Sequence, residues 1–293
     1  MRNYIYLSIV TGLMLGGCSM IQVVEDTSVI LPTELQSDTQ LLRLKRPERE
    51  LFGEIVDYQI DNYTITEQRV SELEAEERLI AKDFQRTGVI DFFLFDGAVS
   101  YLKKKYAINT ARSFSFNLVQ NQQQKVDAKC WMYALSEQTR QSDNSFGFKG
   151  HINSSSTEFS SRQKTELLCE LAHEKKSWQL RLESSKEGPI ALELKSETEA
   201  FAIKTIDRAV SFLSSNNGSE TRELPRWASK DAGVELSYDG EVVAAYSFIG
   251  QQKVWLSSQL SIEHKELLLA MSQSLSILNW QDKQWNDRDY FQM

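Results

Sequence analysis

The chain has 293 residues, of which 41% are hydrophobic and 25% are charged, and its formal net charge is -8 at pH 7. This composition is typical of globular proteins, and the length suits one large domain or two modest ones. The acidic balance argues against a nucleic-acid partner, because phosphates require a basic protein face. It also argues against electrostatic adhesion to anionic lipid.

The first eighteen residues have the organisation of an export signal. Arg2 is the only charge before an apolar run over residues 4–14, which is too short to span a membrane. The run ends in Leu15-Gly16-Gly17-Cys18. This motif resembles the lipobox of bacterial lipoproteins, in which the signal is cleaved before an acylated cysteine. An ordinary signal, or a buried amphipathic helix with an incidental cysteine, remains the alternative.

The resemblance implies a division of the chain into three parts. Residues 1–17 are expected to form the signal peptide, and residues 18–50 the lipidated Cys18 and a polar tether. Residues 51–293 are expected to form a β-rich periplasmic domain, with an internal break near 214–220. The tether contains a Leu41-Leu42-Arg43-Leu44 segment that could instead pack on the domain.

The resemblance also implies a location. In lipoproteins of bacteria with two membranes, an aspartate after the lipidated cysteine commonly retains the protein at the inner membrane. Here Ser19 and Met20 occupy the next two positions. We therefore expect attachment by N-terminal acyl chains to the periplasmic face of the outer membrane, with exposure on the cell surface left open.

The first half of the domain combines three kinds of expected element. Residues 52–65 alternate in part and favour a strand or hairpin. Residues 66–84 have helical spacing with charged neighbours at i and i+4, which predicts a helix. Strands are expected over 89–95, 113–118 and 128–135, and the polar stretch 138–162 is expected to be a long loop. Residues 165–172 and 177–184 are expected to form a hairpin.

The second half has clearer local signals. Strands are expected over 190–194 and 200–206, followed by a flexible loop over 214–219. Residues 234–238 and 241–245 flank Asp239-Gly240, the residue pair that a type I′ hairpin turn requires. A further strand is expected over 254–256.

The C-terminal segment predicts a buried helix. Ser261 is a suitable N-cap, and residues 267–271 are apolar on all sides of a helix. The tail over 280–293 is expected to fold back over the domain edge. The fold class is therefore α+β and β-rich, with an antiparallel sheet or barrel and a mostly buried C-terminal helix. This order of elements resembles that of the tubby-like barrels, although no residue motif supports the comparison.

Cysteine usage predicts one disulfide. With Cys18 assigned to lipid, Cys130 and Cys169 remain as an even pair in an oxidising compartment, where disulfides persist. Two buried free thiols are the alternative. No CxxC motif or Cys/His cluster is present, so the sequence indicates neither a metal site nor a cofactor.

Catalytic motifs are absent from the sequence. The three histidines, His151, His173 and His264, have no partner at metal-ligand spacing and are interpreted as surface or capping residues. The acid pairs Asp91 with Asp96 and Asp282 with Asp287 could serve a glycosidase only across a suitable cleft. No G-x-S-x-G, P-loop or dinucleotide fingerprint occurs.

Three functional hypotheses follow. The first is a binding or structural component of the envelope that contacts another protein or a glycan. If Trp131, Trp178 and Trp255 were exposed together, they would form its groove. The second is a lipid-anchored hydrolase, which requires converging carboxylates or a Ser–His contact. The third is a carrier of an apolar ligand, which requires a barrel interior that the helix does not fill.

Overall fold

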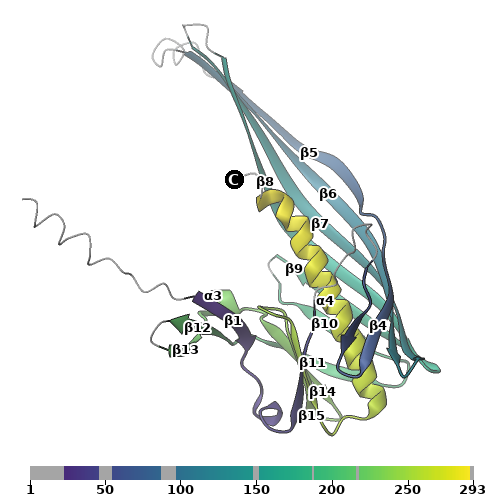
Figure 1. Cartoon of the computed structure of the whole chain (residues 1–293). Coiled ribbons are helices and arrows are strands. Elements are labelled where there is room, and N and C mark those ends of the chain that lie inside the picture. Colours follow the sequence, from purple (N-terminus) through teal and green to yellow (C-terminus); the bar gives the residue numbers. More distant parts are fainter. Residues whose placement is uncertain are drawn as a thin grey trace, which may run out of the picture.

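Antiparallel pairing between strands builds most of the molecule (Figure 1). The structure, a computed structural model, describes residues 23–45, 55–86, 97–147, 152–186, 188–215 and 218–290. Its elements are β1 (Val23–Val29), η1 (Thr33–Leu35), β2 (Thr39–Arg43), β3 (Tyr58–Ile60), β4 (Tyr63–Val70), β5 (Glu74–Arg86), β6 (Gly97–Gln120), β7 (Gln123–Gly147), β8 (Ile152–His173), β9 (Lys176–Ser185), β10 (Ala191–Lys195), β11 (Ala200–Ile206), β12 (Ala209–Ser215), β13 (Gly218–Glu223), α3 (Arg226–Ser229), β14 (Gly233–Tyr238), β15 (Glu241–Ser247), β16 (Lys253–Ser257) and α4 (Ile262–Tyr290).

The main sheet has thirteen strands. Twelve of them follow one another in the order β2-β16-β15-β14-β11-β10-β9-β8-β7-β6-β4-β3, and β5 pairs with β6 beyond β4. Leu42 near one end of this order and Ile60 at the other belong to the same hydrophobic core. The sheet is therefore a near-closed antiparallel barrel around α4. This agrees with the predicted fold class, and with a tubby-like barrel in these coarse terms only.

Alternation of apolar and polar residues explains which face of the barrel strands points inward. On β7, Val126, Ala128, Cys130 and Met132 are buried, whereas the residues between them point outward. Residues of a strand alternate between the two faces of a sheet, so a half-buried strand needs this period of two. The predicted hairpin of β8 and β9 shows the same alternation and is confirmed.

The C-terminal helix fills the barrel. Every residue from Leu267 to Leu278 is buried, as the apolar run predicted. Ser261 is the N-cap, because its Oγ accepts a hydrogen bond from the backbone N–H of His264 at 3.2 Å. The hydroxyls of Ser272 and Ser274 donate to carbonyls one turn back, at 2.7 and 2.9 Å. These bonds allow polar residues to lie within the buried part of the helix.

A smaller sheet packs beside the barrel. It has the order β1-β12-β13, and it covers a second core that includes Val29, Leu35, Ala209 and Trp255. The predicted Asp239-Gly240 hairpin joins β14 to β15 in the main sheet, and both turn residues have positive φ, at 51° and 86°. The predicted turn is confirmed.

Parts of β6, β7 and β8 continue past the barrel and, together with β5, form a long projection, which we call the arm (Figure 1). Pairing between β8 and β9 ends at Lys164 opposite Ser185, and pairing between β4 and β6 ends at Val70 opposite Phe114. Beyond these points the sheet consists of β5 and the adjoining parts of β6, β7 and β8. The arm therefore comprises residues 74–86, 97–112, 134–147 and 152–163.

Two of the expected elements that are wrong lie largely in the arm. Residues 66–84, predicted to be a helix, form parts of β4 and β5, because pairing with β6 overrides a local charge pattern that also suits a helix. Residues 138–162, predicted to be a loop, lie mostly in β7 and β8. Their polar composition reflects a sheet with solvent on both faces, where no apolar alternation is needed.

Part of the expected tether is built into the sheets. Residues 23–29 form β1 and residues 39–43 form β2, with Leu42 and Leu44 in the main core. Residues 214–215 and 218–219, expected in a loop, belong to β12 and β13. Residues 280–290, expected in a tail that folds back, instead continue α4. Outside the described residues lie the leader with Cys18, the expected strand over 89–95, and residues 291–293.

Candidate interaction surface

The outer face of the barrel carries three exposed apolar side chains side by side. Trp131 and Tyr133 lie two residues apart on β7, and Leu168 of β8 is paired with Trp131. Their exposed fractions are 42%, 44% and 41%. We call this set the outer patch. It exists because the alternate residues of the same strands, such as Met132 and Leu167, face the core.

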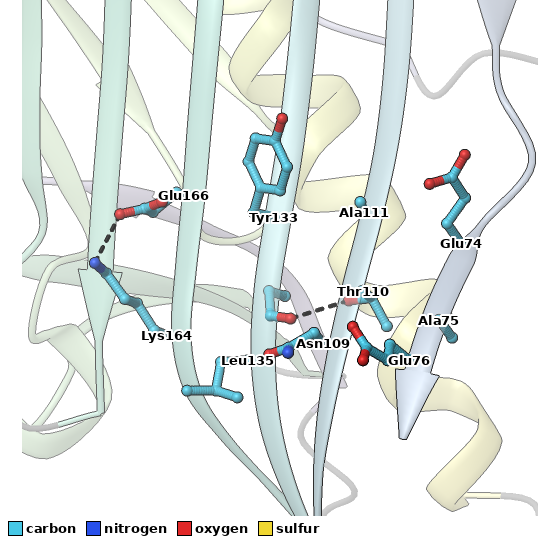
Figure 2. Close-up of a pocket in the computed structure, with 11 residues that line it drawn as sticks. Glu74, Ala75, Glu76, Asn109, Thr110, Ala111, Tyr133, Leu135, Lys164 and Glu166 are labelled. Carbon is cyan, nitrogen blue, oxygen red and sulfur yellow. Dashed lines mark hydrogen bonds and ion pairs between the residues drawn. The ribbon is translucent and has the colours of Figure 1, made fainter. Parts of the chain in front are cut away.

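A groove lies on one side of the outer patch (Figure 2). It has a volume of about 480 Å³ and crosses four strands. Its lining comprises Glu74, Ala75 and Glu76 of β5, Asn109, Thr110 and Ala111 of β6, Tyr133, Ala134 and Leu135 of β7, and Lys164 and Glu166 of β8. Figure 2 shows Tyr133 and Glu166 on the near side of the sheet, with α4 behind it.

The charges in this first groove are partly neutralised within the chain. Lys164 Nζ lies 2.6 Å from Glu166 and 3.0 Å from Glu183. Hydrogen bonds to these two carboxylates raise the pKa of Lys164 above its ordinary value. Lys164 is therefore held between two acids, and the rim of the groove carries charges of both signs.

A second groove lies on the other side of the outer patch. Its volume is about 470 Å³, and Trp131 and Leu168 form its apolar part. Its polar rim includes Arg181, Glu193 and Lys195. Lys195 Nζ lies 3.0 Å from Glu193 and lowers the pKa of that carboxyl through a hydrogen bond. The outer patch therefore separates two grooves, and the rim of each groove carries both acidic and basic side chains.

The predicted disulfide lies directly beneath the outer patch. Cys130 and Cys169 are paired across β7 and β8, bonded to each other, and buried. Trp131 follows one of these cysteines in the chain and Leu168 precedes the other. The cross-link therefore ties together the two strands that present the patch.

The three tryptophans singled out in the sequence do not form one groove. Trp178 is fully buried and Trp255 is 7% exposed, so both belong to cores, and Trp131 alone is exposed. Tyr133 and Leu168 were not identified from the sequence. The period-two alternation of residues 128–135 already placed Tyr133 on the face of Trp131, opposite Cys130 and Met132.

The histidines hold the fold at the base of α4. His173 is buried against Glu266 and is not a surface residue as expected. His264, in the first turn of α4, lies 3.3 Å from Glu199 and packs on the Tyr238 ring at 4.4 Å. His151 lies outside the described residues, as do Asp91, Asp96 and the side chains of Asp282 and Asp287.

Among the described residues, no three His, Cys, Asp or Glu side chains are grouped so that they could hold a metal ion. No helix in the same set of residues is long and apolar enough to cross a membrane. Comparisons of the chain with known families, with curated proteins and with solved structures found no match.

Proposed function

We propose that this chain is a lipid-anchored protein on the periplasmic face of a bacterial outer membrane, and that it binds another envelope protein through the outer patch. The lipobox-like Leu15-Gly16-Gly17-Cys18 supports the anchor. The observation that carries the binding role is the joint exposure of Trp131, Tyr133 and Leu168 on disulfide-linked strands.

The composition of this surface favours a protein partner. Tryptophan and tyrosine dominate the binding energy of protein interfaces when they lie near the centre, and a polar rim surrounds them. Here the rim carries charges of both signs around a small apolar centre, and Lys164–Glu166 and Lys195–Glu193 are paired within it. Such a rim offers both donors and acceptors of hydrogen bonds to a partner.

The carrier hypothesis has less support, because α4 occupies the space that an apolar ligand would need. Leu267, Met271 and Leu275 of this helix are all fully buried in the main core. Both grooves lie on the outside of the sheet, where a ligand would stay in contact with water.

The hydrolase hypothesis also has less support. The nearest acidic partners of His173 and His264 are Glu266 and Glu199, and both pairs lie at the base of the helix. In the first groove Glu166 is paired with Lys164. A general acid needs a carboxyl that is free to protonate a bound substrate.

Membrane fractionation tests the anchor. We expect Cys18→Ser to release the protein from membranes or to leave it unprocessed. The parent should sediment with outer-membrane markers, and Ser19→Asp should move it to the inner membrane. An unchanged mature mass and fractionation for Cys18→Ser would contradict the anchor.

Patch substitution tests the partner. Cross-linking in intact cells followed by quantitative mass spectrometry should identify a partner, and its recovery should fall at least tenfold in a Trp131→Ala, Tyr133→Ala variant. Trp227→Ala is the matched control, because Trp227 is 85% exposed on α3, away from the patch. Equal recovery from both variants would contradict the proposal. Patch-dependent binding to purified peptidoglycan would replace the protein partner by a glycan.

A further inference from the structure

The arm has two edges along which the described chain pairs no second strand. β5 pairs with β6 on one side only, over Glu74–Arg86. The segment 152–163 of β8 pairs with β7 on one side, because β9 has already ended at Ser185. On the other side of this segment, the Gln163 carbonyl accepts a hydrogen bond of 3.0 Å from the backbone N–H of Lys186. An unpaired edge presents a row of backbone N–H and C=O groups, which can pair with another strand.

Large apolar side chains are exposed on both edges. Leu79 and Phe84 of β5 are 49% and 61% exposed, and Phe159 of β8 is 60% exposed. Phe159 lies within a regularly paired part of β8, and Leu79 is paired with Tyr106 next to an irregularity in the register of β5. Exposed apolar groups on a long edge strand indicate a surface that becomes covered.

One arginine of the arm, Arg140, contacts residues of the three other strands. Arg140 of β7 donates two hydrogen bonds to Glu77 of β5, both of 2.8 Å, and a third of 3.2 Å to Glu158 of β8. Its guanidinium also lies over the Tyr106 ring of β6, 4.5 Å from the centroid. All four strands contribute to this cluster, so the two outer edges are held at a constant separation.

We call a row the set of residues, one from each of the four strands, that pair directly with one another across the arm. Compared row by row, the two outer edges of the arm complement each other in charge. Cross-strand pairing places Lys82 of β5 in the same row as Glu158 of β8. A second row contains Glu77 and Arg162. No other row between residues 77–86 of β5 and 152–163 of β8 pairs like charges, whereas Glu74 shares its row with Glu166, beyond this edge. A second copy placed beside the first at the same height would therefore bring Lys82 close to Glu158 and Arg162 close to Glu77, two carboxylates that Arg140 also contacts.

A third row adds an apolar contact. It contains Ala81 on the β5 edge and Phe159 on the β8 edge, with their side chains on the same face. The strand directions agree as well. β5 and β8 run in opposite directions within the arm, so β5 of a neighbouring copy in the same orientation would be antiparallel to β8.

We propose that copies of this chain assemble edge to edge through their arms, with β5 of one copy pairing antiparallel to residues 152–163 of the next in the row register just described. The contact uses different surfaces on its two sides, so each added copy leaves one edge of each kind exposed. Such contacts build closed rings or open filaments rather than two-fold dimers. This assembly does not depend on the outer patch or on its partner.

A two-fold dimer through β5 alone fits less well. Antiparallel self-pairing over the whole strand, centred on Ile80, would place Glu77 opposite Asp83 and Arg78 opposite Lys82. Like charges directly opposite each other destabilise a strand pair. The heterologous pairing of β5 with β8 avoids both of these contacts.

Disulfide trapping tests the register. The full chain carrying both Ala81→Cys and Phe159→Cys is oxidised in membranes and run on a non-reducing gel. Directly paired strand residues lie close enough for a disulfide, so we expect a ladder of dimers, trimers and larger species. On this gel, each single variant and the parent should run as monomers, because no disulfide joins their copies. A dimer from Ala81→Cys alone would overturn the proposal in favour of β5–β5 pairing.

Two controls make the trapping specific. Thr139 lies in the same row and on the same face as Ala81 and Phe159, but on the interior strand β7. The Ala81→Cys, Thr139→Cys variant should therefore form no ladder. A ladder from this control variant would mean that the disulfides form by random collision, which would contradict the proposed register. The absence of a ladder from the Ala81→Cys, Phe159→Cys variant would overturn the proposed pairing.

Sedimentation of the detergent-extracted full chain tests assembly without relying on register. We expect species larger than a dimer at micromolar concentration. Phe159→Lys should raise the concentration needed for assembly at least tenfold, because a lysine at the edge opposes pairing. Trp227→Lys, which changes an even more exposed residue elsewhere, should leave assembly unchanged. A parent that sediments as a monomer would overturn the proposal.

Discussion

Nε2 of His173 lies 2.7 Å from Oε2 of Glu266, and the two side chains are only 4% and 3% exposed. The same carboxylate accepts a hydrogen bond from the Tyr63 hydroxyl at 3.5 Å and lies 4.0 Å from Lys125 Nζ. Three barrel strands, β4, β7 and β8, therefore hold one residue in the second turn of α4. This contact fixes where the helix enters the barrel.

The first prediction concerns this buried pair. Removing one partner leaves the other buried without compensation, so Glu266→Ala should cost about 3–5 kcal/mol of unfolding free energy. Urea denaturation measures the change. Glu263→Ala is the control, because its ion pair with Lys176 is largely exposed and should contribute about 1 kcal/mol or less. Equal losses for the two variants would show that burial does not decide the effect.

The second prediction concerns the buried length of α4. Leu268→Ala should lower the unfolding free energy by about 2–5 kcal/mol, because the barrel can collapse only partly around the lost volume. Ile262→Ala, at the exposed start of the helix, should change it by less than about 0.5 kcal/mol. Thermal melts that coincide for parent and Leu268→Ala would contradict the position of the helix inside the barrel.

Local signals in the sequence were sufficient where short-range chemistry determines structure. The Asp239-Gly240 turn requires positive φ at both residues, and few other residue pairs adopt it readily. The helix after Ser261 has both a capping residue and an apolar circumference. In each case the local preference and the final fold agree, so the prediction did not depend on distant residues.

The arm could not be predicted in the same way. Its strands have solvent on both faces, so the alternation that marks a barrel strand is lost. Residues 138–162 therefore look like a loop, and the charges of residues 72–82 look like an exposed helix face. What decides the structure is pairing over long distances in the chain, such as Glu77 with Ile108. The main sheet likewise incorporates Leu42 from the expected tether through pairing with Val254.

The outer patch was partly predictable. Cysteine counting named the pair that the structure joins, and alternation along residues 128–135 indicated which side chains share a face with Trp131. Exposure was not predictable, because a tryptophan in a strand is more often part of a core. Trp178 and Trp131 both lie in strands of the same sheet. They differ in whether the side chain points into the barrel or out of it.

The third prediction concerns the disulfide. Alkylation of the denatured mature protein without reductant should label neither Cys130 nor Cys169, and reduction should release two thiols. Because the bridge constrains the unfolded chain, a Cys130→Ala, Cys169→Ala variant should lose about 2–5 kcal/mol of stability. Detection of two free thiols before reduction would contradict the bridge. Peptide mapping distinguishes these sites from Cys18.

The fourth prediction concerns pH and Glu199. Hydrogen bonds from Lys176, at 2.8 Å, and from His264 hold the pKa of this carboxyl below its ordinary value of 4.5. The folded state therefore favours the ionised form. The ionised Glu199 carboxyl makes its full contribution to stability at pH values above its ordinary pKa. This contribution is lost as the pH falls through the lowered pKa of the folded state.

Replacement of Glu199 by glutamine isolates this contribution. Partly exposed ion pairs contribute roughly 1 kcal/mol, so Glu199→Gln should lower the unfolding free energy by about that amount at pH 7. The gap between parent and variant should hold down to about pH 5 and should close at more acidic pH, because the parent carboxyl then becomes neutral as well. Urea denaturation between pH 3 and pH 7 measures the gap. Glu197→Gln, at an exposed neighbouring position, should show no comparable gap at any pH. A difference for Glu199→Gln that stayed constant to pH 3 would mean that the lost interaction depends on shape rather than on charge.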